Sequence, residues 1–287
     1  MHSEEPPEKE NEYRSSLSVY DDHGNLLEFI KYNDSEEEEE KTISVYDSNN
    51  HLMSEETFYV LDDTSEKRTI KRNEQGDAVE EIKTFTDGSE SRQEFVYETG
   101  ANKMNVTHYD EDNKVEFLES FIFSDEKRTD LSEYTKTDPN AKIIENSKFI
   151  HDPANNSLIQ EYFSAEGNIR SKRIMKFNEH GVELESAEYN EKGEVTSKTY
   201  SEYDENGNIS RKIIKDFHSR TVNYQYDEKN RVVVEDLFDE NNTLIRRQTY
   251  EYDESDNVLE DTYYQIDVTR SGRDEYTGNR YEYEYFG

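Results

Sequence analysis

The sequence predicts an all-β protein, an up-and-down antiparallel meander that forms an extended, twisted, largely single-layer sheet of open, solenoid-like character. A short phrase returns seven times within residues 163–256: an aromatic residue, a small polar residue, two further residues and then, in six copies, Gly or Asn. The first four copies begin at Phe163, Phe177, Tyr189 and Tyr203, so longer and shorter steps alternate and the pattern has a 26-residue double period. A fixed period of this length is typical of repeat architectures.

Each copy of the phrase is predicted to be a hairpin turn. Gly and Asn tolerate a positive φ, and an Asp or Asn side chain can cap its own turn. The pattern matches a type I turn closed by a left-handed residue in a bulge. We therefore expect a positive φ at Gly24, Asn50, Gly76, Asn113, Asn155, Gly167, Gly181, Gly193, Gly207, Asn230 and Asn242.

The spacing of the turns also predicts the strands. A repeat of about 12 to 14 residues supplies one turn and one strand of about seven to nine residues, which makes roughly twenty strands in the whole chain. No sustained 3.6-residue apolar pattern with caps is present, so almost no helix is expected.

The domain organisation follows from composition and period. Residues 1–12 contain Pro6, Pro7 and five Glu, and are predicted to be a disordered acidic leader. Turns that begin at Tyr20, Tyr46 and Arg72 are separated by the same double period, which places the N-terminal region in the same array. We therefore expect residues 13–286 to form one continuous β-hairpin repeat array.

The conformations of two short stretches, one acidic and one aromatic, can also be predicted. The run from Glu36 to Glu40 is expected to be a solvated, elongated turn, with an electrostatic docking segment as the alternative. Alternating Tyr and Glu at residues 281–285 predict a strand with one aromatic face, preceded by a bend around residues 271–273.

The composition does not favour a deep core. Only 31% of residues are hydrophobic, 36% are charged, and the mean hydropathy is -1.21, which by itself would suggest disorder. However, the 22 Tyr and 13 Phe recur with the period. A thin sheet in which each strand buries against its neighbours reconciles the two observations.

The formal net charge of -35 limits the classes of molecule that the protein is expected to bind. It argues against direct binding of nucleic acid, whose phosphates carry the same sign, and favours a protein with a basic surface. No apolar run long enough for membrane insertion and no signal-peptide core are present, so a cytoplasmic protein or a secreted mature form are both compatible with this chain. The compartment and the oligomeric state stay open.

No catalytic, cofactor-binding or metal site is predicted, and the chain is not expected to be an enzyme. The sequence contains no Cys and no nucleophile elbow, phosphate loop or dinucleotide motif. Calcium binding is the alternative at the turns that begin with Asp204 and Asp239, where oxygen-bearing side chains alternate. These turns contain fewer ligand positions than an EF-hand loop requires, so they are interpreted as structural.

Tyrosines provide the candidate contact residues. Six of them are expected to form cross-strand aromatic pairs: Tyr200, Tyr203, Tyr224, Tyr226, Tyr250 and Tyr252. The alternative is a tyrosine-lined groove for a protein or a glycan, whose contact residues would be Tyr224, Tyr226, Tyr250 and Tyr252.

Two basic clusters interrupt the acidic sequence, and their members are Arg170, Lys172, Arg173, Arg211 and Lys212. They are expected to pair with Glu on adjacent strands; as an alternative, a basic stripe on an acidic body would orient a partner.

The turn phrases resemble those of two repeat families. The segments Tyr-Gln-Tyr-Asp-Glu-Lys-Asn-Arg-Val at residues 224–232 and Tyr-Glu-Tyr-Asp-Glu-Ser-Asp-Asn-Val-Leu at residues 250–259 look like the YD repeats of Rhs-type proteins. Tyr-Asp-Glu-Asn-Gly-Asn-Ile at residues 203–209 is similar to bacterial MORN-variant repeats, including those of antitoxin-like proteins. The resemblance implies an extended β-scaffold for contact or display and supplies no catalytic residues. The double period is longer than usual for either family, and 287 residues are too few to enclose the shell that long YD-repeat chains build.

Three functions are compatible with these observations. The leading one is a non-enzymatic repeat scaffold that binds another protein through an extended acidic and aromatic sheet face, including an immunity or antitoxin-like role. The second is an acidic mimic of nucleic acid that inhibits a DNA-binding protein. The third is a cell-surface adhesin or spacer.

Overall fold

The computed structural model describes residues 12–266 and 275–285. This part of the chain contains 21 β-strands and one short 3-10 segment, η2 (Thr99–Ala101). The prediction of an all-β meander with almost no helix is confirmed. The predicted leader at residues 1–12, apart from Glu12, and the bend at residues 271–273 lie outside the described residues.

The chain divides into two compact units. Among the described residues, the first comprises residues 12–149 and 162–168, and the second comprises residues 150–161, 169–266 and 275–285. The strands β11 (Ile143–Asp152) and β12 (Ser157–Phe163) contain residues of both units.

In the first unit, ten strands precede β11, and each pairs with its chain neighbours in antiparallel register. They are β1 (Ser16–Tyr20), β2 (Leu26–Tyr32), β3 (Glu38–Tyr46), β4 (Leu52–Tyr59), β5 (Thr64–Arg72), β6 (Ala78–Phe85), β7 (Glu90–Glu98), β8 (Lys103–Tyr109), β9 (Val115–Phe123) and β10 (Leu131–Thr137).

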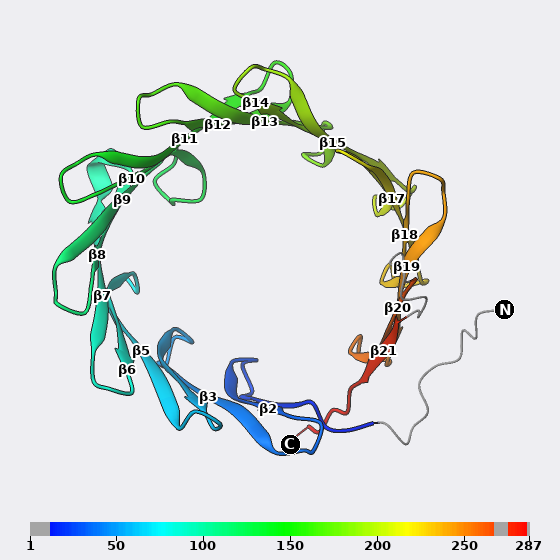
Figure 1. Ribbon diagram of the computed structural model, residues 1–287, viewed down its shortest axis with the longest axis horizontal. Helices are drawn as coiled ribbons and strands as arrows, with labels where there is room; N and C mark the ends of the chain where they lie inside the picture. Colours follow the sequence, from blue (N-terminus) through cyan, green and yellow to red (C-terminus); the bar gives the residue numbers. More distant parts are fainter. Residues whose placement is uncertain (1–11, 267–274, 286–287) are drawn as a thin grey trace. The chain divides into compact units, whose positions relative to one another are not determined.

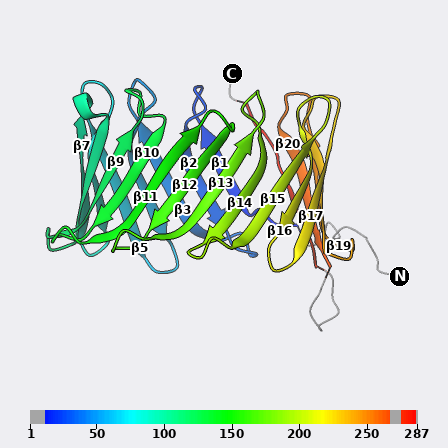
Figure 2. The same cartoon turned by 90° about the horizontal axis from the view of Figure 1, so that it is seen from above.

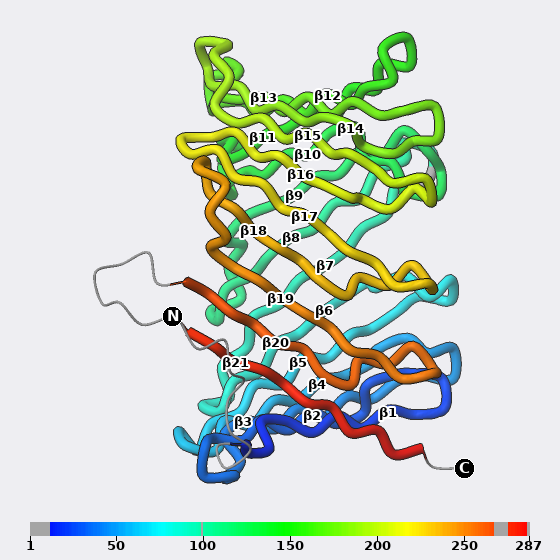
Figure 3. The backbone as a smooth tube through the Cα atoms, turned by 90° about the vertical axis from the view of Figure 1, so that its right-hand side faces the viewer, coloured from blue at the N-terminus to red at the C-terminus, as the bar shows by residue number. Residues whose placement is uncertain are grey.

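In the second unit, nine strands continue the same up-and-down order (Figures 1 and 2). They are β13 (Ile169–Phe177), β14 (Glu183–Asn190), β15 (Val195–Tyr203), β16 (Ile209–Lys215), β17 (Ser219–Tyr226), β18 (Val232–Phe238), β19 (Leu244–Tyr252), β20 (Val258–Gln265) and β21 (Glu275–Arg280). Figure 3 shows the backbone running to and fro from β17 to β20.

The turn at Asp204 shows why these hairpins form. The Asp204 Oδ1 atom accepts the backbone N–H of Asn206 at 2.9 Å and that of Asn208 at 2.8 Å. The N–H of Gly207 donates to the Asp204 carbonyl at 3.1 Å, and Gly207 has φ = 85°. The bond from the Asn208 N–H is the main reason that the pKa of Asp204 lies below its usual value.

The same two bonds to an Asp or Asn side chain occur in ten further turns, and the Ser164 hydroxyl accepts the equivalent pair from Glu166 and Asn168. One local hydrogen-bond pattern therefore forms most of the hairpins. The accepting Asp and Asn residues are Asp21, Asn33, Asp47, Asn73, Asp138, Asn178, Asn190, Asp227, Asp239 and Asp253.

Ten of the eleven residues predicted to have a positive φ do so. The exception is Asn155: the left-handed residue of that turn is the next one, Asn156, with φ = 46°. Three turns place residues other than Gly, Asn or Asp at this position, with φ = 60° at Glu36, 59° at Arg128 and 61° at Ala141. A local sequence pattern limited to Gly and Asn could not identify them.

Ala141→Gly is expected to stabilise the protein by about 0.5 to 1 kcal/mol, because an L-residue with a Cβ is strained in the left-handed region. Thermal and chemical denaturation would measure the gain. Ala154→Gly is the matched control: Ala154 is an exposed turn residue outside the positive-φ set, so the substitution is expected to lower stability slightly. Equal losses for the two variants would contradict the strain at Ala141.

The strands form a single layer in each unit, because the extensive contacts of each strand are with its chain neighbours. Burial is correspondingly thin. The buried apolar residues are Ile30, Ile70, Val106, Ala187 and Val222, and the buried polar residues are Ser44, Ser147, Ser186, Asp236 and Asp261. Stability therefore comes from lateral packing between strands.

Two local predictions were wrong. Residues 38–40 of the acidic run belong to β3, and the turn is shorter than expected, from Asn33 to Glu37. Residues 281–285 form no strand; β21 ends at Arg280. The alternating tyrosines of this segment still face one neighbour: the Tyr281 hydroxyl bonds to Asp261 at 2.6 Å and the Tyr283 hydroxyl to the Val258 carbonyl at 2.8 Å.

Candidate functional site: acidic strand ends and a tyrosine face

The negative charge of the described chain is concentrated between the strands. The strands hold 28 acidic and 23 basic residues, whereas the described segments outside them hold 35 acidic and 8 basic residues. Because successive connections of a meander lie at opposite ends of its strands, the excess carboxylates follow both ends of the strands in each unit.

On the sheet faces, opposite charges meet between neighbouring strands. Arg246 on β19 bonds to Glu235 on β18 at 2.6 Å, and Lys83 on β6 lies 2.6 Å from Glu66 on β5. The faces are therefore nearly neutral, and the strand ends are the strongly acidic part of the surface.

The four candidate contact tyrosines lie on two strands of the second unit. Tyr224 and Tyr226 lie on β17, and Tyr250 and Tyr252 lie on β19, with β18 between them. Register places Tyr224, Glu235 and Gln248 side by side, so all four rings share one face, which we call the tyrosine face. Each of the four tyrosines is half-buried.

The predicted cross-strand pairing of six tyrosines was wrong. They lie on β15, β17 and β19, because one double period spans two strands. Tyr200 also points to the opposite face from Tyr203, which is an odd number of positions later on the same strand. Cross-strand ring contacts occur elsewhere: His108–Phe117 at 3.9 Å, Phe121–Tyr134 at 5.1 Å and Tyr264–Tyr276 at 6.4 Å between ring centroids.

A tyrosine at or just beside the end of a strand makes a repeated structural contact. The Tyr252 hydroxyl donates to the Val232 carbonyl at 2.8 Å, and the Tyr226 hydroxyl donates to the Ile209 carbonyl at 2.8 Å. Each acceptor lies two residues after the left-handed residue of the preceding turn at the same end of the strands. Equivalent bonds join Tyr97 to Ala78, Tyr203 to Glu183 and Tyr283 to Val258.

These bonds separate the four candidates into two pairs. The hydroxyls of Tyr226 and Tyr252 are hydrogen-bonded to backbone carbonyls of the sheet. Tyr224 and Tyr250 are the better candidates for contact with a partner, because their hydroxyls bond to no described residue. Burial is the main reason that the pKa values of Tyr224 and Tyr250 are raised.

At one turn an arginine takes the place of the tyrosine and makes the same contact, which was not predicted from the sequence. Arg72 occupies the strand-ending position of its turn, and its Nη2 atom donates to the Leu52 carbonyl at 3.2 Å. Leu52 lies two residues after Asn50, as the tyrosine acceptors do after their own left-handed residues. The double period that separates Tyr46 from Arg72 was the signal for this role.

The expected pairing of the basic clusters is confirmed only for Arg211, which lies 3.8 Å from Glu202. Arg170, Lys172, Arg173 and Lys212 form no ion pair with any residue that the structure describes.

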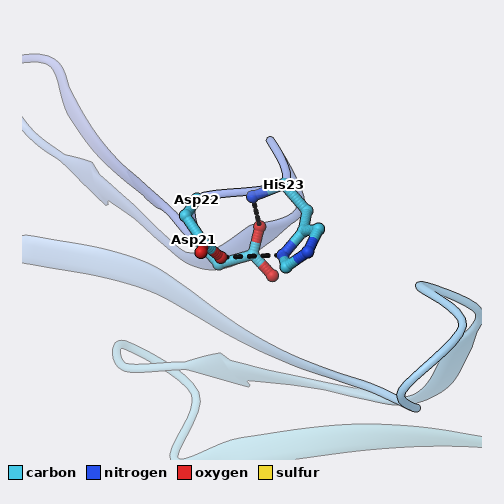
Figure 4. Close-up of side chains that lie close together, drawn as sticks. All are labelled: Asp21, Asp22 and His23. Atoms are coloured by element: carbon cyan, nitrogen blue, oxygen red, sulfur yellow. Dashed lines mark hydrogen bonds and ion pairs between the residues drawn. The ribbon is translucent and has the colours of Figure 1, made fainter.

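Asp21, Asp22 and His23 gather ligand-type atoms within 4.8 Å of one another (Figure 4). The Asp21 carboxylate already accepts the N–H groups of His23 and Asn25 and the side-chain amide of Asn25. This set is therefore explained by turn formation. The same holds for the turns at Asp204 and Asp239, where one carboxylate oxygen accepts two backbone N–H groups.

In residues 12–266 and 275–285, no helix has both the length and the apolar character needed to cross a membrane.

The fold and the repeated turn contacts define an antiparallel β-hairpin repeat protein. No family model and no curated protein matches the chain. Solved structures to which the chain is similar include a Photorhabdus luminescens Tc holotoxin pore, with 11% identity, a TM-score of 0.31, and coverage of 92% of this chain and 16% of that one. A TcdB2–TccC3–Cdc42 crystal structure has 12% identity and a TM-score of 0.33, and the match covers 94% of this chain and 17% of that one.

A porin-like protein from Bacteroides uniformis has 11% identity and a TM-score of 0.32, with coverage of 83% of this chain and 92% of that one. The chain spans about one sixth of the length of the two toxin chains.

Proposed function

We propose that this chain is a non-enzymatic repeat scaffold that binds a protein with a basic surface. The acidic strand ends attract the partner, and the exposed parts of Tyr224 and Tyr250 provide apolar contact on the tyrosine face. The observation that carries the proposal is the segregation of charge: the connections are strongly acidic, whereas ion pairs nearly neutralise the strands.

The arrangement suits electrostatic steering. Many of the carboxylates lie on short turns held by their own hydrogen bonds, so their positions are determined before a partner arrives. Exposed charges act over a Debye length of about 8 Å at physiological ionic strength. Complementary fields of this kind raise association rates more than they strengthen the final complex.

The association rate with the partner is expected to fall about tenfold as salt rises from about 0.05 M to about 0.5 M. Affinity capture at low salt would isolate the partner, and stopped-flow kinetics would give the rate. A rate constant that does not change with salt would show that the acidic strand ends do not steer binding.

Two double variants compare the effect of turn charges on association with the effect of strand charges. Glu205→Gln with Glu254→Gln removes two exposed turn charges, and Glu116→Gln with Glu251→Gln removes two exposed strand charges. The turn variant is expected to slow association more than the strand variant. If salt has no effect, Tyr224→Ala and Tyr250→Ala test the tyrosine face directly, with folding monitored in parallel.

We further propose that the scaffold is related to a known family of repeat proteins. The turn phrase and its hydrogen bonds support a relation to YD-repeat or MORN-variant proteins, and an immunity or antitoxin-like role is consistent with that relation. Affinity capture with toxin candidates that have basic surfaces tests this narrower proposal.

A second candidate is an acidic mimic of nucleic acid. Turns at one end of the sheet recur every second strand, about 9.6 Å apart for strands separated by about 4.8 Å. In the second unit, turns such as that at Asp253 contribute one to three acidic residues each. This corresponds to one charge per about 3 to 10 Å, which at the most acidic turns approaches one phosphate charge per about 3.4 Å of each DNA strand. Competition with DNA for the captured partner would distinguish the mimic from a scaffold that leaves DNA binding unchanged.

A further inference from the structure

Three lysines converge on one face of the second unit. Lys198 on β15 and Lys215 on β16 are direct register partners, and so are Lys176 on β13 and Glu185 on β14. Glu185 is in turn the register partner of Tyr200, two residues after Lys198. Register and two-residue alternation place all five side chains on one face, which we call the lysine patch.

The contacts within the lysine patch are short. The Lys198 Nζ atom lies 2.9 Å from Glu185 Oε1 and donates to the Tyr200 hydroxyl oxygen at 2.9 Å. The Lys176 Nζ atom lies 3.6 Å from the same Glu185 oxygen. The Lys215 Nζ atom lies 5.5 Å from the centre of the Tyr200 ring. Three ammonium groups therefore surround one carboxylate and one phenol.

The lysine patch has a net positive charge, although acidic residues outnumber basic residues in the protein as a whole. Three lysines and one glutamate give it a local charge of about +2, and Lys215 has no ion pair among the described residues. The nearest carboxylate in sequence, Asp216, bonds instead to Arg220 and to the backbone N–H of His218.

Like charges directly opposite one another on adjacent strands destabilise a sheet. The Lys198–Lys215 pair therefore costs stability: Glu185 neutralises Lys198, but no acidic residue in the described chain forms an ion pair with Lys215. The hydrogen bond with Tyr200, followed by that with Glu185, raises the pKa of Lys198 above its usual value, so this lysine keeps its charge at neutral pH.

We propose that the lysine patch binds a compact, doubly charged oxyanion, namely a phosphate group. A dianion neutralises the local charge, and lysine ammonium groups bind phosphate as point charges. The Tyr200 hydroxyl accepts its bond from Lys198 and retains its own proton to donate to a phosphate oxygen. Extended polyanions are disfavoured because the acidic strand ends lie on either side, whereas a compact group interacts within a Debye length.

Titration of the whole chain with inorganic phosphate, followed by NMR or calorimetry at low ionic strength, tests the proposal. Saturable binding is expected, and Lys215→Gln is expected to weaken it about fivefold through loss of a charge-assisted hydrogen bond. The variant should fold normally, because Lys215 has no ion pair to lose. Lys192→Gln, on an exposed turn away from the lysine patch, is the matched control and should bind phosphate as the wild type does.

Two further arms complete the test. Acetate, a monoanion, is expected to bind more weakly than phosphate; equal binding of the two would overturn the assignment of a dianion. Phenyl phosphate represents a phosphorylated side chain: tighter binding than inorganic phosphate points to a phosphorylated partner, and equal binding points to free phosphate. Failure to detect phosphate binding, or unchanged affinity in Lys215→Gln, would refute the proposal without bearing on the acidic strand ends.

Discussion

Arg247→Leu is expected to lower the free energy of unfolding by about 2 to 3 kcal/mol. The Asp236 side chain is only 8% exposed, and Arg247 holds both of its oxygens, through Nε at 2.7 Å and Nη2 at 2.9 Å. Removing one partner leaves a buried carboxylate unpaired, which costs about 3 to 5 kcal/mol in a closed core, and less here because Arg247 is half exposed. Chemical denaturation would measure the loss.

Two variants control this prediction. Arg246→Leu removes the partner of Glu235 on the opposite face, where the carboxylate is more exposed, and is expected to cost about 1 kcal/mol. Adding Asp236→Leu to Arg247→Leu should restore most of the lost stability, because no charge then remains buried. A double variant as unstable as the single one would show that the loss arises from packing and not from charge.

Gly207→Val is expected to destabilise the protein by about 2 kcal/mol through strain in the turn backbone. Gly207 has φ = 85°, a region that a β-branched residue strongly disfavours. A Cβ at this position would meet no atom within 4 Å, so a steric clash with neighbouring atoms would not explain the loss. The melting temperature, compared with that of the wild type, would measure the effect.

Gly100→Val is the matched control, because Gly100 has equal space around it but lies outside the positive-φ set. It should melt closer to the wild type than Gly207→Val does. His180→Ala, at an exposed turn position, is expected to leave folding unchanged. If Gly207→Val melted at the wild-type temperature, the turn at Asp204 would not have the backbone conformation described here.

The turns could be predicted because their chemistry is local. The Asp204 carboxylate bonds to N–H groups two and four residues later, and the left-handed position at Gly207 follows from the same short phrase. Where another residue type occupies that position, as Ala141 does, the phrase is no longer recognisable even though the turn is the same. The shift from Asn155 to Asn156 has the same origin.

Neighbours across strands could not be predicted in the same way. The sequence assigned tyrosines such as Tyr224 and Tyr250 to cross-strand pairs, yet β18 lies between them. The register of a hairpin depends on its bulge, and a slip of one residue moves every side chain to the other face. The Asp236–Arg247 pair and the lysine patch depend on such registers.

The sequence by itself determined where the chain turns, how long its strands are and that its connections are acidic, because each of these properties resides in a few consecutive residues. Only the tertiary structure decided which side chains share a face and which charges remain without a counter-charge. Lys198 and Lys215 share a face, and Lys215 has no ion pair among the described residues. The physical reason is that these contacts join residues of different strands, and strand register brings them together.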